Sequence, residues 1–260
     1  MELRPNRVRR KLEAGEPAFV VGGVTHADDI DALGPIGFDG IWLEGEHGGV
    51  DAADLGNLTR ACDIWGMTSL VRVNRNDQGL IYRTLDRGAQ AIVVPHVDTR
   101  ADAENVVAGG KFPPLGKRGM DGAGADADYA LANPREYLEH VAQEVFLVFQ
   151  IEDKEAVEAI DEIADVEGFD VFFVGMGDLS LSYGVPFDFG NPILQEALER
   201  VAEAARKTGR WWGTPTGNPE HAQRIINLGG RMVTAGGDHM ALLKGFQKSF
   251  EDFSSVRLPG

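Results

Sequence analysis

Two carboxylates that each follow an apolar segment in the middle of the chain are the first candidates for chemistry. Glu152 ends the segment that begins at Val145 (VFLVFQIE), and Asp178 follows the segment VFFVG that begins at Val171. The near-continuous apolar character is typical of strands buried on both faces of a parallel sheet. A stretch with helical spacing separates them, so a strand–helix–strand unit would bring both acids to the carboxyl ends of its strands, where α/β sheets bind ligands.

Other polar side chains stand at the ends of further apolar segments and widen the chemistry that is available. Two carboxylates at one edge, Glu152 and Asp178, are hard oxygen ligands that suit Mg²⁺ or Mn²⁺. Arg72 offers a planar fork for a carboxylate or a developing enolate oxygen. His47 follows Glu44 after another such segment and would move a proton near neutral pH. The combination predicts metal-assisted enolate chemistry beside a carbonyl.

Each of these residues also has an ordinary structural explanation. A single glutamate at a strand end is usually a helix cap or a solvated side chain, and a lone histidine is more often a hydrogen-bonded structural residue. Arg72 would be explained equally well by a paired carboxylate inside a barrel. His96, at the end of another apolar segment, is either a second rim histidine or a satisfied core histidine, and we favour the core histidine. What favours function is the pair Glu152 and Asp178 on neighbouring strands.

The distribution of lysine argues against one common alternative chemistry. A Schiff-base aldolase needs a lysine within an apolar barrel strand. None of the seven lysines lies in the core of a predicted strand, and the nearest, Lys154, stands two residues beyond Glu152. The sequence therefore favours metal-dependent over imine chemistry.

The elements that must position these residues alternate between strand and helix along the whole chain. Such alternation indicates a parallel sheet, and eight units in 260 residues match a single-domain (β/α)8 barrel that spans residues 1–260. A leading helix over Arg7–Ala14 would cap the bottom of the barrel. The predicted strands are Phe19–Val24, Gly40–Glu44, Ser69–Val73, Ala91–Val97, Val145–Ile151, Val171–Gly175, Trp211–Pro215 and Arg231–Ala235. The clearest predicted helices are Ala52–Trp65, Gly79–Arg87, Ala101–Ala108, Glu155–Ala164, Pro192–Lys207, Pro219–Leu228 and His239–Phe246.

Composition limits the partners and the compartment. The net charge is −16, which makes nucleic acid and anionic membranes poor partners. No apolar run reaches the ~18 residues that a membrane-spanning helix needs. The single cysteine, Cys62, lies in a helical pattern and forms no intrachain disulfide, so we expect a core-packing thiol and a reducing cytoplasm.

Four motifs, in order along the chain, give it a family resemblance. They are FDGIWLEGEHGG, GAQAIVVPHVDTRADAENVV, FPPLGKRG and FQIEDKEAVEAIDEIADVEGFDVFFVGMGDLSLSYG. The chain resembles the HpcH/HpaI family of class II, pyruvate-dependent aldolases, over roughly residues 5–250. The resemblance implies a divalent metal ion, with Mg²⁺ or Mn²⁺ expected first and Co²⁺ or Zn²⁺ left open. It also implies a trimer of dimers in which C-terminal helices are exchanged between subunits.

The resemblance further implies a role for each site residue. Glu152 and Asp178 would be the metal ligands, with Gln150 as the polar residue beside them. Arg72 would neutralise the pyruvate enolate. The substrate would be a 4-hydroxy-2-oxo acid, cleaved to pyruvate and an aldehyde. Glu44 and His47 would form a carboxylate–histidine pair that acts through water. The backbone of Gly177 and Asp178 would hold the pyruvate carboxylate. Arg118 would reach the aldehyde end of the substrate.

Several segments depart from the family pattern, among them the first strand, which lacks a usual tryptophan, and TAGGDHM near the end of the chain, and two single positions keep alternatives open. Glu44 stands where the family commonly has aspartate, and Met176 replaces a proline. Because side chains alternate along a strand, Glu44 and His47 meet only if the chain turns after Glu44, which Gly45 permits. The first alternative is decarboxylation of oxaloacetate or a related 2-oxo acid through the same enolate. The second is a catalytically poor protein that binds a metal or a 2-oxo acid.

Overall fold

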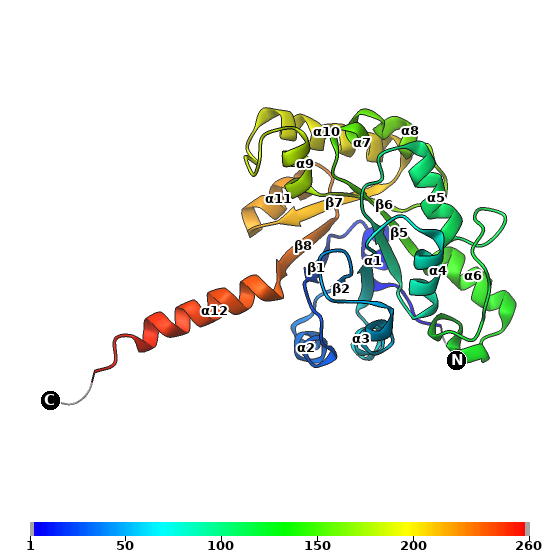
Figure 1. Ribbon diagram of the computed structural model, residues 1–260, viewed down its shortest axis with the longest axis horizontal. Helices are drawn as coiled ribbons and strands as arrows, with labels where there is room; N and C mark the ends of the chain where they lie inside the picture. The colour runs from blue at the N-terminus through cyan, green and yellow to red at the C-terminus, as the bar shows by residue number, and fades with distance from the viewer. Residues whose placement is uncertain (1–2, 258–260) are drawn as a thin grey trace.

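A computed structural model describes residues 3–257 of the chain. Eight parallel strands pair in sequence order, and β8 pairs with β1, so the sheet closes into a barrel (Figure 1). This confirms the predicted single-domain (β/α)8 fold, and each observed strand overlaps the predicted one. The strands are β1 (Ala18–Gly22), β2 (Gly40–Glu44), β3 (Thr68–Arg72), β4 (Ala91–Val94), β5 (Phe146–Ile151), β6 (Val171–Val174), β7 (Trp211–Thr216) and β8 (Met232–Gly237).

Helices surround the barrel and connect its strands. In residues 3–257 no helix is both long enough and apolar enough to traverse a bilayer. Two short 3₁₀ segments, η1 (Gly34–Ile36) and η2 (Ala125–Ala130), lie in loops. The α-helices are α1 (Arg7–Glu13), α2 (Ala27–Leu33), α3 (Ala52–Ile64), α4 (Gln78–Asp86), α5 (Arg100–Gly110), α6 (Pro134–Glu144), α7 (Lys154–Glu158), α8 (Ile160–Ala164), α9 (Met176–Ser182), α10 (Pro192–Thr208), α11 (Pro219–Asn227) and α12 (Asp238–Phe253).

The helix prediction was incomplete in three places and too simple in a fourth. Helices α2, α6 and α9 are absent from the predicted set, and the helix predicted over Glu155–Ala164 breaks at Ala159 into α7 and α8. Helices α2 and α9 have seven residues each, too short for a full apolar period to show. For α6 a usable signal existed, because Asn133 caps the helix and Pro134 occupies its first turn.

Apolar residues at alternate positions along the strands fill the barrel interior, and the polar residues of the predicted site lie above this packed layer. The interior cluster includes Trp42 on β2, Leu70 on β3, Val148 on β5 and Phe173 on β6. As predicted, helix α1 closes the bottom of the barrel, and its Val8 and Leu12 belong to the same cluster. The members of the cluster are Val8, Leu12, Ala18, Val20, Trp42, Leu70, Ala91, Val93, Phe146, Val148, Val171, Phe173 and Met232. This packing makes the carboxyl ends of the strands the open end of the barrel.

The next inward positions above this layer are the predicted site residues. Two residues beyond Trp42 and Leu70 stand Glu44 and Arg72, which are direct register partners on β2 and β3. Two residues beyond Val148 stands Gln150 on β5. The period of two along each strand therefore carries the side chains from packed interior to open rim.

Helix α12 leaves the barrel instead of packing beside β8. Figure 1 shows it projecting away from the rest of the molecule, and none of its residues is buried. Its outward course leaves the ring of helices open between α11 and α2. A shallow pocket there is bordered by Phe19 on β1, the turn before α11, and Ala235 on β8.

Candidate active site

A pocket at the carboxyl ends of the strands gathers six of the predicted site residues. Glu44, Arg72, Gln150, Glu152, Gly177 and Asp178 all line it. Its apolar walls come from β2, β6, the start of α9, and β7. They consist of Trp42, Phe173, Met176 and Pro215. Six of the eight predicted site residues therefore share one pocket, and the other two, His47 and Arg118, do not line it.

Arg72 is held at the bottom of this pocket by carboxylates from β2 and the turn that follows it. Its Nη2 lies 2.6 Å from Glu44 Oε2, and its Nε donates to both oxygens of Glu44 at 2.8 and 3.0 Å. Its Nη1 lies 2.9 Å from Glu46 Oε2. Bidentate pairing fixes the plane of a guanidinium, so Arg72 presents its remaining N–H groups in one orientation.

Glu44 is a structural anchor for this arginine and for the turn. Besides Arg72, it accepts hydrogen bonds from the indole of Trp42 at 3.1 Å and from the backbone N–H groups of Glu46 and His47 at 2.8 and 3.1 Å. Burial acts to raise the pKa of Glu44. The hydrogen bonds and charge of Arg72, with those backbone donors, outweigh burial and hold the pKa below its ordinary value.

The structure does not bring the side chains of Glu44 and His47 together as a pair. The chain does turn after Glu44, but the turn presents the backbone N–H of His47 to Glu44 rather than its imidazole. The His47 ring is 70% exposed, and its Nε2 lies 3.8 Å from Glu46 Oε2. Glu46, and not Glu44, is therefore the carboxylate beside His47 in this arrangement.

Glu152 is a buried carboxylate with an incomplete set of partners. Only 1% of it is exposed; it accepts from the backbone N–H of His96 at 3.0 Å and from the amide of Gln150. Burial raises its pKa above the ordinary value although these donors and His96 act to lower it. The carbonyl oxygen Oε1 of Gln150, itself buried, has no hydrogen-bond partner. A buried acid and an unpaired carbonyl oxygen side by side form an environment in which a cation would satisfy both.

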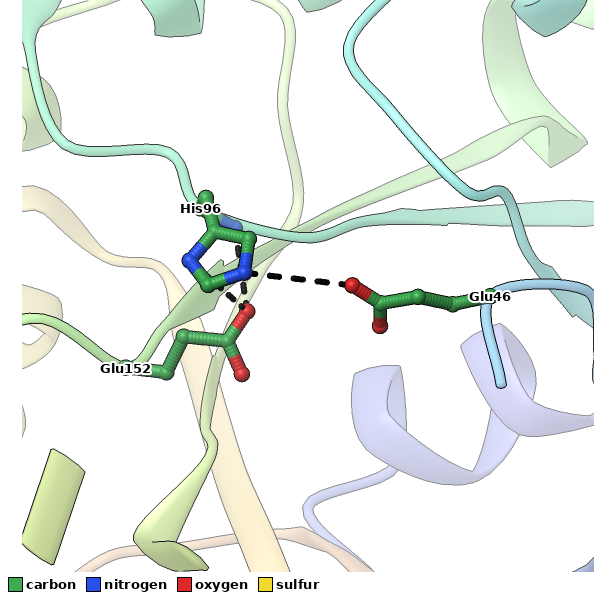
Figure 2. Close-up of side chains that lie close together, drawn as sticks. All are labelled: Glu46, His96 and Glu152. Carbon is green, nitrogen blue, oxygen red and sulfur yellow. Dashed lines mark hydrogen bonds and ion pairs between the residues drawn. The ribbon is translucent and has the colours of Figure 1, made fainter. Parts of the chain in front are cut away.

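His96 is not the packed core histidine that we predicted. Its backbone has a φ of 51°, so the chain leaves β4 in the left-handed region and the ring turns toward the rim. Nδ1 lies 2.7 Å from Asp153 Oδ2, while Glu46 and Glu152 flank the ring (Figure 2). Burial acts to lower the pKa of His96, but Asp153, Glu152 and Glu46 outweigh it and raise the pKa above its ordinary value.

Asp178 and Gly177 line the same pocket as Glu152, so they could contact a ligand bound between them and Glu152. Both belong to the first turn of α9, which begins directly after β6. The Asp178 side chain is exposed and lines the same pocket as the buried Glu152. Glu152 is therefore held in place by its surroundings, whereas Asp178 is free to contact a ligand.

The structure does not bring Arg118 to this pocket. Its side chain is fully buried beneath the long loop, where its Nη2 pairs with Asp86 at 2.7 Å and with Asp126 at 2.6 Å. The guanidinium also stands 4.8 Å from the ring of Phe112. Arg118 is thus committed to holding the loop on α4, and the aldehyde contact predicted for it has no support within this subunit.

The donor groups present fit a divalent cation. Oxygen donors come from Glu152, Glu46 and Asp178, and a nitrogen donor comes from His96. Ligand atoms of Glu46, His96 and Glu152 all lie within 4.8 Å of one another. Hard carboxylates with one imidazole suit Mg²⁺, Mn²⁺ and their first-row neighbours.

Sequence reasoning assigned no role in the site to Trp42 or Glu46, and it favoured a core position for His96. Trp42 had a signal, because it precedes Glu44 by two residues and so shares its strand face. Glu46 and His96 lie beyond the ends of β2 and β4, where the regular alternation stops and gives no face. Only the turn geometry places them.

We expect Gly175→Ala to displace Glu152. A Cβ at this position would lie 2.5 Å from Glu152 Oε2 and 2.8 Å from Glu152 Cβ. Such overpacking costs ~1–3 kcal/mol, and the metal dissociation constant should rise as the carboxylate moves. Thermal unfolding and metal titration measure the two effects.

Gly177→Ala is the matched control, because its Cβ would meet no atom within 4 Å. It should keep or raise the melting temperature, since alanine favours a helix over glycine by up to ~1 kcal/mol. Equal unfolding curves for the two variants would show that the space at Gly175 does not position Glu152.

Comparison with known proteins agrees with this fold. Residues 21–244 match the family model described as HpcH/HpaI aldolase/citrate lyase. A hydroxypyruvate/pyruvate aldolase of Pseudomonas aeruginosa is 32% identical over 95% of this chain and 92% of its own. A 2-keto-3-deoxy-L-rhamnonate aldolase of Klebsiella pneumoniae is 31% identical over 84% of this chain and 82% of its own. The crystal structure of an HpcH/HpaI aldolase from Desulfitobacterium hafniense superposes with a TM-score of 0.89, at 29% identity over 97% of both chains.

The family model and the aldolase relatives identify the chain as a carbon–carbon lyase of the class II aldolase type. The chain belongs to the HpcH/HpaI aldolase/citrate lyase family. Membership in a class II family implies a divalent metal ion, and the acidic cluster at the rim is a place where one fits.

Proposed function

We propose that this enzyme cleaves 4-hydroxy-2-oxo acids to pyruvate and an aldehyde, with a pyruvate enolate as the intermediate. The observation that carries this proposal is Arg72, which lines the same pocket as Glu152 and whose guanidinium is fixed by two carboxylates. A fixed cation at the bottom of a pocket lined by Trp42 and Phe173 is suited to charge that develops on a small oxo acid.

Glu152 and Asp178 are the proposed protein ligands of the metal, with Mg²⁺ or Mn²⁺ as the first candidates. When bound, a divalent cation would polarise the 2-oxo group of the substrate as a Lewis acid. Gln150 holds the carboxylate of Glu152 in place through its amide. The exposed Asp178 supplies the second oxygen donor from the first turn of α9.

The remaining residues bind the substrate and move protons. Arg72 stabilises the negative charge on the enolate oxygen. The backbone N–H groups of Gly177 and Asp178, at the start of α9, face the pyruvate carboxylate. His47, exposed and beside Glu46, takes the 4-hydroxyl proton through a water molecule as the C3–C4 bond breaks. Protonation of the enolate then yields pyruvate.

The test is a pyruvate-release assay coupled to lactate dehydrogenase, run over a panel of 4-hydroxy-2-oxo acids that includes 2-keto-3-deoxy sugar acids. Pyruvate should appear with Mn²⁺ or Mg²⁺, disappear after exhaustive chelation, and return when the metal is restored. Full activity after chelation, or no pyruvate from any substrate with metal present, would refute the proposal. Release of CO₂ from oxaloacetate without any aldehyde product would favour the decarboxylase alternative.

We also propose that the enzyme works in the reducing cytoplasm, which the free and buried Cys62 supports. Burial raises the pKa of this thiol, so it remains protonated and inert at neutral pH. Recovery of the protein with the cytoplasmic fraction tests this assignment, and its recovery outside the cell would contradict it.

A second copy of the chain is the proposed occupant of the opening between α11 and α2. Helix α12 carries an exposed apolar stripe that no part of residues 3–257 covers, formed by Met240, Leu243, Phe246, Phe250 and Phe253. The pocket beside Phe19 and Ala235 stands where a closed ring of eight helices would place the last one. Exchange of α12 between two subunits would fill both pockets, and three such dimers would make the proposed hexamer.

We expect Phe250→Asp to weaken this assembly, because a charge in a packed helix face leaves a buried carboxylate unpaired. Light scattering coupled to size exclusion should show smaller species than for the wild type. Lys244→Asp adds the same side chain away from the stripe and should leave the mass unchanged. Equal masses for both variants and the wild type would remove α12 from the interface.

A further inference from the structure

His96 occupies a position that the roles proposed above do not use. Its backbone N–H donates to Glu152 at 3.0 Å, and its backbone has a φ of 51°, with the side chain beside Glu46 and Glu152. Asp153 Oδ2 lies 2.7 Å from its Nδ1 and fixes the orientation of the ring. A carboxylate that accepts one ring N–H leaves the lone pair of the other nitrogen, Nε2, directed away from it.

The free nitrogen faces Glu46, and the ring stands between two acids. Nε2 lies 3.9 Å from Glu46 Oε1, and Nδ1 lies 3.7 Å from Glu152 Oε1 (Figure 2). A first-row cation binds nitrogen and oxygen donors at ~2.0–2.2 Å, so two of its ligand atoms stand up to ~4 Å apart. The gap between His96 and Glu46 is too long for a hydrogen bond and has the width of a shared cation.

A buried polar group outside this trio also offers an oxygen donor to a cation. The Oε1 of Gln150 has no hydrogen-bond partner although the residue is only 3% exposed, and its amide nitrogen is bound to Glu152. Gln150 lines the pocket together with Glu152. Buried carbonyl oxygens without partners are rare, and a nearby ion or its water shell would satisfy this one.

We propose that His96 is a nitrogen ligand of the divalent cation held at Glu152, with Glu46 as a further oxygen donor. An imidazole ligand favours Co²⁺, Zn²⁺ and Mn²⁺ over Mg²⁺, which takes oxygen donors. His96 thereby sets the metal preference of the site, and Asp153 orients it as carboxylates orient metal-bound histidines. This inference rests on the proposed metal dependence and concerns which metal is bound and by which atoms.

The experiment compares metal binding by the metal-free, full-length wild type and His96→Gln. Dissociation constants for Mg²⁺, Mn²⁺, Co²⁺ and Zn²⁺ are measured by competition titration. Loss of the imidazole should weaken Co²⁺ and Zn²⁺ binding by at least ~10-fold, while Mg²⁺ changes much less. The visible absorption spectrum of the Co²⁺-loaded wild type should differ from that of the variant, because its ligand field loses a nitrogen.

Two further variants separate ligation from other roles of His96. His26→Gln removes an exposed histidine at the start of α2 and should leave every dissociation constant unchanged. His96→Lys keeps a positive charge among Glu46, Glu152 and Asp153 but supplies no lone pair while protonated. If it retains the metal preference of the wild type, or if His96→Gln binds Co²⁺ and Zn²⁺ as tightly as the wild type, His96 is a counter-charge and the proposal is wrong.

The outcome is distinguishable from failure of the proposed function. A metal-dependent lyase whose metal preference survives His96→Gln would refute this inference alone. A chain that binds no divalent metal in any variant would refute both.

Discussion

Arg72→Ala should lower kcat/KM for carbon–carbon cleavage by ~10²–10³-fold, the usual cost of removing a fixed donor to a developing oxyanion. The same substitution should slow exchange of pyruvate methyl protons with D₂O, followed by NMR, and any decarboxylation of oxaloacetate. All three reactions pass through the enolate whose charge Arg72 stabilises. Arg72→Lys is the matched comparison, since it keeps the charge but loses the bidentate hold on Glu44.

Thermal unfolding must accompany these rates, because Arg72 also neutralises Glu44 and Glu46. Removing it leaves two largely buried carboxylates without their cation, which costs stability. A folded Arg72→Ala variant with undiminished proton exchange would show that the arginine only organises the turn after β2.

His47→Ala separates proton transfer from enolate stabilisation. If His47 moves the 4-hydroxyl proton, its loss should lower cleavage by ~10²–10⁴-fold, while decarboxylation of oxaloacetate falls less because no hydroxyl is deprotonated. The ring is exposed and makes no short contact, so the fold should be unaffected. Equal loss in both reactions would assign His47 to shaping the site.

Glu152→Gln should abolish most metal binding, and with it cleavage, because a neutral amide is a poor ligand for a hard cation. We expect the metal dissociation constant to rise by at least ~100-fold. Loss of a residue that only orients a ligand costs ~10–100-fold in metal affinity, and loss of a direct ligand should cost more. Glu155→Gln changes an exposed glutamate three residues away and should leave the dissociation constant unchanged. An unchanged constant for Glu152→Gln would place the metal elsewhere.

For the metal-free protein, the direction in which Glu152→Gln changes the melting temperature can also be predicted. Because burial raises the pKa of Glu152, the cost of its ionisation to folding grows as the pH rises from its ordinary pKa to the raised one, and it is fully present above the raised one. The amide carries no such charge, and Gln150 can rotate its unpaired carbonyl oxygen toward it. The metal-free Glu152→Gln variant should therefore melt at or above the wild-type temperature at neutral pH, and a lower melting temperature would contradict this.

Much of the fold and the centre of the site follow from the sequence because strand geometry is local. A period of two places Glu44 above Trp42 and Arg72 above Leu70, and parallel strands bring their carboxyl ends to one edge. Eight apolar segments with helical spacing between them predict the barrel, and Glu152 directly follows one of those strands. These inferences need only the backbone repeat and the burial of apolar side chains.

The tertiary structure alone decided which partner each residue meets. Glu44 pairs with Arg72 instead of His47, Arg118 is buried under its own loop, and His96 leaves the core for the rim through a left-handed turn. The course of α12 away from the barrel likewise follows from no local pattern. Loop torsions and long-range ion pairs set these positions, and they depend on segments far apart in the chain that pack only in the folded molecule.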